Sequence, residues 1–251
     1  MIKAVIFDLD GTLANTMPDL QTAMNGMLTK LGYKTRTRVE LLGFINRGSR
    51  EFVRRSLPKE VQGVEFILDS ALQIYEDEYS RCYDDKTIAY TGINDLITNL
   101  KAKGIKLAVL SNKQDPFVKR IIEVLFGKDA FKIAMGQSTM PVKPNPTAPH
   151  YITKHLGVKP NNCLFVGDSD VDMETAKNAG MTSVGVAWGY RPKESLQEAG
   201  ANYLIDEPKE ILEIIDKIKA DEEAEALRLK EERKRNKGKK IFKHDPPKEN
   251  N

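Results

Sequence analysis

The chain has 251 residues, of which 40% are hydrophobic, so it can bury a sizeable core as one large domain or two smaller ones. Its apolar runs fall far short of the roughly 20 residues of a membrane helix. Two cysteines, Cys82 and Cys163, cannot form a disulfide framework, and three scattered histidines exclude a histidine-rich metal site. Charged residues near the N-terminus argue against a signal peptide, so we expect a cytoplasmic protein with no membrane partner.

The net charge of +3 is unevenly distributed. The segment from Lys217 to Asn251 holds 12 Lys and Arg against 8 Asp and Glu, a surplus of 4, so residues 1–216 carry a net charge of −1. The body therefore lacks the positive field typical of nucleic-acid binding, and nucleic acid is not an expected partner. We interpret residues 217–251 as a charged, solvated helix or disordered tail. A basic arm from Arg228 to Lys243 that binds RNA or anionic lipid stays open as an alternative.

Short apolar runs rich in β-formers recur along the chain and alternate with helical patterns. The predicted strands are Ile2–Phe7, Lys106–Leu110, Lys132–Met135, Cys163–Val166, Thr182–Ala187 and Asn202–Ile205. The predicted helices between or after them are Ile93–Lys103, Pro116–Phe126, Thr147–His155, Asp172–Asn178 and Pro208–Lys219. Continuous apolar strands are covered on both faces, and their alternation with helices predicts an α/β fold with a doubly wound, parallel, Rossmann-like sheet. Ligands of such sheets bind beyond the carboxyl ends of the strands.

One stretch, from about Asn15 to Asp84, shows helical periodicity only. Two clean stripes at helical spacing run from Leu20 to Leu31 and from Val64 to Tyr79. This pattern predicts a small all-helical domain of residues 15–84 inserted after the first strand. The α/β core then consists of residues 1–14 and 85–216, and the tail of residues 217–251.

Polar residues follow four of the predicted strands, where an inert fold does not require them. They are Asp8, Asp10 and Thr12 after the first strand, Ser111 and Asn112 after the second, Lys143 beyond the third, and Asp168, Asp170 and Asp172 after the fourth. Each group alone can also be explained by a purely structural role, as a turn, a helix cap or a surface lysine. Together they predict one site, because the carboxyl ends of parallel strands meet at one edge of the sheet.

The chemistry of this set is coherent. Clustered carboxylates repel one another unless a cation neutralises them, and a ligand set of oxygen atoms favours Mg²⁺. A carboxylate beside the cation can attack phosphorus and form an aspartyl-phosphate. A lysine and a hydroxyl group can balance the charge of the phosphoryl oxygens, and a second carboxyl group can protonate the leaving oxygen.

In this order and at these strand ends, the four motifs resemble those of the haloacid dehalogenase superfamily, and the helical insert resembles its cap domain of the first type. The resemblance covers about residues 1–216. It implies that Asp8 is the nucleophile and a Mg²⁺ ligand, and that Asp10 is the general acid and base and ligates the metal through its main-chain carbonyl. It implies that Asp168 is the third metal ligand. Asp172 is a supporting acid, and Asp170 has no assigned role.

The resemblance also assigns the contacts to the substrate. Ser111 binds the phosphoryl oxygens, helped by the backbone of Asn112, and Lys143 orients and neutralises the phosphate and the nucleophile. We also expect Thr12 to bind the substrate. We add the hypothesis that Arg47, in the polar loop Asn46–Arg50, reaches an oxyanion of the substrate.

Asp10 favours phosphomonoester chemistry, because dehalogenases lack a carboxylate two residues after the nucleophile and ion pumps carry threonine there. Residues 167–180 and 188–191 resemble the phosphoglycolate phosphatases, so we expect a small phosphorylated metabolite, with phosphoglycolate favoured, and a monomer or dimer. Asn15-Thr16 departs from the Asp-Ser of relatives, which affects the cap hinge.

Three alternatives stay open. The first is a phosphosugar mutase like β-phosphoglucomutase, although Leu20 stands where such enzymes carry a histidine. The second is a nucleotidase or pyrophosphatase on the same scaffold. The third is a non-enzymatic binding protein that uses the basic tail.

Overall fold

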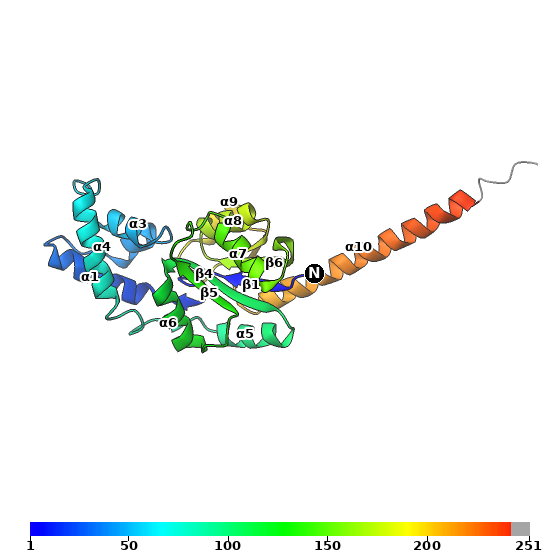
Figure 1. Ribbon diagram of the computed structural model, residues 1–251, viewed down its shortest axis with the longest axis horizontal. Coiled ribbons are helices and arrows are strands. Elements are labelled where there is room, and N and C mark those ends of the chain that lie inside the picture. Colours follow the sequence, from blue (N-terminus) through cyan, green and yellow to red (C-terminus); the bar gives the residue numbers. More distant parts are fainter. Residues whose placement is uncertain (242–251) are drawn as a thin grey trace, which may run out of the picture. The chain divides into compact units, whose positions relative to one another are not determined.

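The computed structural model describes residues 1–241 (Figure 1), and the chain divides into two compact units. One unit is Ile2–Leu212, and the other is Met1 together with the residues from Glu213 on. The candidate site residues all belong to the first unit.

A six-stranded sheet forms the centre of the first unit, and every pair of neighbouring strands is parallel. In the order in which they lie, its strands are β5 (Ile133–Gln137), β4 (Lys106–Gln114), β1 (Ala4–Phe7), β6 (Cys163–Gly167), β7 (Thr182–Val186) and β8 (Tyr203–Ile205). The predicted doubly wound α/β fold is confirmed. The structure differs at β4, which continues four residues past its predicted end at Leu110.

Both faces of the sheet are covered by helices, as the continuous apolar strands predict. The helices are α5 (Ile93–Ala102), α6 (Asp115–Phe126), α7 (Thr147–Leu156), α8 (Asp170–Ala179) and α9 (Lys193–Glu198), with a short 3₁₀ turn, η1 (Pro160–Asn162). Figure 1 shows α7 to α9 on one side of the sheet and α5 and α6 on the other. Ala4 and Ile6 pack in one hydrophobic cluster with α7 and α8, while Phe7 meets Phe131 edge to face at 6.3 Å. Successive side chains of β1 thus point to opposite faces of the sheet, and both faces are apolar. This explains why β1 has no polar face.

The helical insert follows β1. It comprises α1 (Met17–Lys30), α2 (Arg38–Phe44), α3 (Ser49–Ser56) and α4 (Glu65–Tyr79). These helices share a hydrophobic cluster whose fully buried members all come from residues 17–82. The chain enters and leaves the insert through a small antiparallel pair, β2 (Ala14–Asn15) and β3 (Ile88–Ala89). This separate cluster supports the prediction that residues 15–84 form a cap. The boundaries of the cap as a separate domain stay a prediction.

The last helix, α10 (Glu210–Ile241), continues 22 residues beyond the predicted end at Lys219. Residues 221–233 are exposed throughout, which fits the solvated charged helix expected there. Residues 242–251 lie outside the described residues; they are the end of the predicted tail and include the last two residues of the basic arm. None of the described helices is both long and apolar enough to cross a membrane.

Candidate active site

The register of the central strands brings the predicted motifs together. Phe7 is level with Val109 on β4 and with Val166 on β6, and β1 lies between these two strands. Asp8 therefore leaves the sheet beside Leu110 and Gly167, one residue before Ser111 and Asp168. The strands that flank β1, β4 and β6, lie on opposite sides of it. Doubly wound sheets bind ligands beyond the carboxyl ends of the strands at such a switch in strand order.

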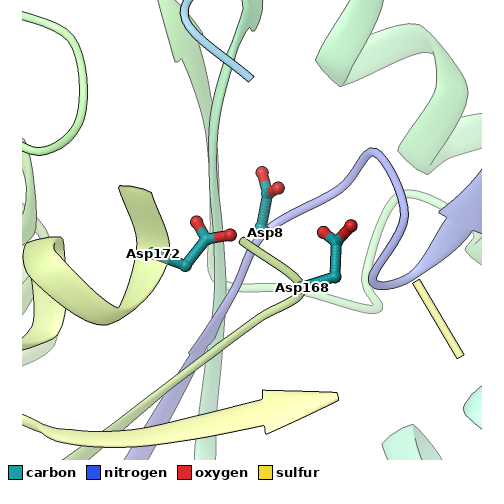
Figure 2. Close-up of side chains that lie close together, drawn as sticks. All are labelled: Asp8, Asp168 and Asp172. Carbon is teal, nitrogen blue, oxygen red and sulfur yellow. The ribbon is translucent and has the colours of Figure 1, made fainter. Parts of the chain in front are cut away.

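Three carboxylates converge at this edge. The side chains of Asp8, Asp168 and Asp172 lie close together (Figure 2). One oxygen of each lies within 4.8 Å of the other two, and all three residues are buried. The side chain of Asp10 is not part of this trio. The structure thus gathers the predicted acids Asp8 and Asp168, and it adds Asp172, which the resemblance treats only as a supporting acid.

The backbone fits closely around Asp168. Its Oδ1 accepts a hydrogen bond of 3.0 Å from Thr12 Oγ1, and its Oδ2 accepts one of 2.8 Å from the amide of Tyr190. A Cβ on Gly11 would lie 2.3 Å from Asp168 Oδ2, and one on Gly189 would lie 2.1 Å from Asp168 Cβ. Gly11 also has a φ of +87°, a backbone conformation that favours glycine.

Thr12 contacts another residue of the site. Its side chain is fully buried and donates to Asp168, and Thr12 is not among the described residues that line the cavity. Its role as a substrate-binding residue stays a prediction.

Lys143 is the cation of the cluster. Its Nζ lies 2.8 Å from Asp8 Oδ1 and 2.6 Å from Asp172 Oδ1, and its side chain is buried. The Asn112 side chain fixes the lysine loop: its Oδ1 accepts from the Lys143 amide at 2.8 Å, and its Nδ2 donates to the Lys143 carbonyl at 3.0 Å. The predicted role of the Asn112 backbone toward phosphate stays a prediction.

Burial and mutual repulsion perturb these groups. Burial raises the pKa of Asp8 to about 7, assisted by the charges of Asp172 and Asp10 and opposed by Lys143. Burial, with the nearby Asp172 and Asp8, also raises the pKa of Asp168 well above its usual range. Burial alone lowers the pKa of Lys143, but the carboxylates of Asp172 and Asp8 outweigh it and raise that pKa overall.

A divalent cation fits this donor set. When ionised, Asp8, Asp168 and Asp172 carry three negative charges, and Lys143 supplies one positive charge. Asp8 Oδ1 is also buried and, apart from its ion-pair contact with Lys143, has no partner in hydrogen-bond geometry among the described residues. An oxygen-only set of this kind suits Mg²⁺.

Asp10 lies beside this cluster with partners of its own. Its Oδ1 accepts a 2.5 Å hydrogen bond from Thr16 Oγ1 and lies 3.0 Å from Lys113 Nζ. The pairing of β4 with β5 is irregular between Leu110 and Gln114, so residues 111–113 leave the regular ladder at the site. Sequence reasoning missed Lys113, whose signal was its position directly after Ser111 and Asn112.

A cavity of about 50 Å³ opens at this edge of the sheet, beneath the helical insert. Its floor includes Asp8, Asp10 and Ser111 with Lys143, and its roof carries apolar side chains of the insert. The described residues that line its roof and side wall include Leu20, Ile45, Asn46, Phe52, Tyr75 and Tyr79.

Arg47 does not line this cavity. Its guanidinium is half exposed and lies 3.4 Å from Asp170 Oδ2, at the rim. An exposed ion pair of this kind contributes little energy. The structure thus gives Asp170, which had no predicted role, a contact to the insert. The contact of Arg47 with the substrate stays a prediction.

We therefore expect Arg47→Ala to change kcat/KM by less than about threefold, because a surface ion pair is worth only about 0–1 kcal/mol. Steady-state kinetics on two phosphomonoesters of different size would check this. A much larger loss confined to one of the two substrates would restore the hypothesis that Arg47 contacts the substrate.

Buried acids with perturbed pKa values, beside a lysine at the carboxyl edge of a parallel sheet, are typical of an enzyme active site. The family model described as haloacid dehalogenase-like hydrolase matches residues 5–186. The chain belongs to the haloacid dehalogenase-like hydrolases, as the sequence motifs predict.

Individual relatives and solved structures are similar to this chain over most of its length. The chain is 32% identical over 211 residues to a phosphoglycolate phosphatase of Psychrobacter arcticus, which covers 82% of this chain and 92% of the relative. A solved structure from Haemophilus somnus 129Pt, described as a predicted phosphoglycolate phosphatase, has a TM-score of 0.79 and 26% identity, covering 85% of this chain and 98% of that one. A β-phosphoglucomutase from Clostridium difficile has a TM-score of 0.70 and 25% identity, covering 86% and 96%.

Proposed function

We propose that the protein is a Mg²⁺-dependent phosphatase that hydrolyses a small phosphomonoester through an aspartyl-phosphate on Asp8, with phosphoglycolate as the favoured substrate. The observation that carries the proposal is the contact of Asp8 with Lys143 inside the buried acidic trio, at the floor of a small cavity. Asp8, Asp168 and Asp172, together with the main-chain carbonyl of Asp10, would hold the metal, which would supply charge stabilisation for the phosphoryl oxygens.

Each residue has its own role in the proposed reaction. An Asp8 oxygen attacks phosphorus while the bond between phosphorus and the leaving oxygen breaks, and Asp10 gives its proton to that oxygen. Lys143 and the hydroxyl group of Ser111 balance the charge of the phosphoryl oxygens. Asp10 then takes a proton from water as the water oxygen attacks phosphorus, which releases phosphate and restores Asp8. The apolar roof excludes other water molecules from the cavity.

One observation favours phosphoglycolate as the substrate. The relatives named above include phosphoglycolate phosphatases. Leu20, which occupies the place of the histidine that mutases carry, is a buried apolar residue of the cavity lining. This residue offers no proton, which argues against the mutase alternative.

The test is a screen for phosphate release with and without Mg²⁺. The panel holds 2-phosphoglycolate, nucleoside monophosphates, sugar phosphates and pyrophosphate, with a separate arm for β-glucose 1-phosphate plus a bisphosphate activator. We expect metal-dependent turnover with the highest kcat/KM on 2-phosphoglycolate. Turnover of a nucleotide or pyrophosphate above all others, or sugar-phosphate isomerisation, would select one of the alternatives.

The acidic trio also predicts how pH and Mg²⁺ act on stability. Burial holds the pKa of Asp8 at about 7, well above that of a carboxyl group in an unfolded chain, so its ionised form destabilises the metal-free fold. The metal-free protein should therefore lose stability as the pH rises from about 4 to about 7. Mg²⁺ requires ionised ligands and should relieve this loss, so its stabilisation should grow over the same range.

Thermal unfolding at pH 5 and pH 8 measures both effects. At one fixed concentration, 100 times the Kd for pH 8, Mg²⁺ should raise Tm by about 5–10 °C at pH 8 and by clearly less at pH 5. Asp168→Asn serves as the control, because it removes one proposed ligand and should abolish the rise. An equal rise in this variant would place the metal elsewhere.

A further inference from the structure

Lys113 is a second buried cation at the cavity, and the phosphoryl chemistry described above does not use it. Its side chain is only 6% exposed, and its Nζ lies 3.0 Å from Asp10 Oδ1 and 4.7 Å from the centre of the Tyr79 ring. Lysine is almost never buried this far unless a charge requires it. Of the described residues that line the cavity, Lys113 and Lys143 are the cations, and Lys143 is already shared between two carboxylates.

Asn46 presents an unused donor to the same cavity. Its side-chain Nδ2 is buried and has no hydrogen-bond partner among the described residues. Its backbone has a φ of +89° and is tied to the core, because its carbonyl accepts a hydrogen bond of 3.0 Å from Asn112 Nδ2. A buried donor without a partner is unfavourable, and a ligand atom that accepts its hydrogen bond would remove this cost.

We propose that Lys113 and Asn46 form a carboxylate subsite, which makes the enzyme selective for phosphomonoesters whose short leaving group carries a carboxylate. This inference rests on the proposed phosphatase function. Among the described lining residues, Lys113 is the cation left for a second anionic group, and the amide of Asn46 supplies a neutral donor. The neighbouring wall is apolar, with Ile45, Phe52 and Phe117, so a carboxylate that enters must be paired.

The pairing of Lys113 with Asp10 also makes selectivity depend on the charge of the leaving group. In the free enzyme, the ammonium group of Lys113 pairs with Asp10. A substrate carboxylate would share that ammonium group, whereas a neutral leaving group would leave the existing pair intact and gain nothing from it. Selectivity should therefore depend on the charge of Lys113 more than on the size of its side chain.

The test compares two substrates of equal length, 2-phosphoglycolate and the neutral 2-hydroxyethyl phosphate. In Lys113→Gln, the ratio of kcat/KM for the acid to that for the alcohol should fall by about ten- to a hundred-fold, as expected for a lost charge-assisted hydrogen bond. In Asn46→Gly, which permits the positive φ, the ratio should fall by about two- to tenfold. Lys119→Gln, on the exposed side of α6, is the matched control and should leave the ratio unchanged.

The outcomes separate the two proposals. Equal loss on both substrates, including complete loss, would show that Lys113 acts only by positioning Asp10 and would overturn the subsite. An unchanged ratio in both variants, or a wild-type enzyme that prefers the neutral ester, would overturn it as well. Absence of any phosphomonoester hydrolysis by the wild-type enzyme would instead refute the proposed function.

Discussion

Replacement of Asp8 by asparagine is expected to lower kcat on every phosphomonoester by at least about 10⁴-fold, because the amide cannot replace the attacking carboxylate. The fold should survive. The asparagine would keep the volume of the buried side chain, and it would remove a carboxylate whose raised pKa makes its charge unfavourable at pH 8. We therefore expect the metal-free variant to have a Tm at pH 8 at least equal to that of the wild type.

Three measurements check this prediction: phosphate release, thermal unfolding and trapping with beryllium fluoride. The trap should bind to Asp8 in the wild type and fail to bind in the variant. Asp206→Asn is a matched control, because Asp206 is exposed and pairs with Lys193 at 2.7 Å, away from the acidic trio. Turnover in Asp8→Asn close to that of the wild type would falsify the aspartyl-phosphate route.

The second large effect concerns Lys143. Lys143→Met removes the positive charge that lies between Asp8 and Asp172, and leaves the carboxylates buried without a counter-charge. Breaking a buried pair in this way costs about 3–5 kcal/mol of unfolding free energy. We expect that loss in the metal-free variant at pH 8, together with a loss in kcat of about 10²- to 10³-fold.

Denaturant unfolding of the two single variants and of the double variant Asp8→Asn/Lys143→Met measures the coupling. The double variant should recover part of the stability lost in Lys143→Met, because one uncompensated carboxylate is gone. Lys154→Met, at an exposed position in the last turn of α7, is the control. Full additivity of the two single effects would mean that Asp8 and Lys143 do not interact energetically.

The sequence predicts most of the sheet, because strands buried on both faces leave continuous apolar runs that end abruptly. The predicted end of β4 at Leu110 is wrong, since polar residues at a site continue the strand without continuing its apolar pattern. The strands β2 and β3 escape prediction, because a two-residue strand has no period to detect. Helix α9, six residues long, leaves no signal for the same reason.

The acids of the site can be predicted because they sit at fixed places beyond strand ends. The substrate contacts of Thr12 and Arg47 stay predictions. A hydrogen-bonding residue beside a site can face the ligand or another site residue, and sequence spacing does not distinguish the two. Lys113 and Asn46 depend on an irregular ladder and a left-handed backbone, which only the folded chain displays.

Asp172 takes part both in the start of helix α8 and in the charged cluster around Lys143. Its Oδ2 accepts from the Ser169 hydroxyl and amide in the capping box that starts α8, and its Oδ1 holds Lys143. Winding of the first turn of this helix is therefore tied to assembly of the charged centre. A change at Ser169, which touches no reacting atom, should loosen both together, so that amide protons in this turn and those around Lys143 would exchange with solvent at linked rates.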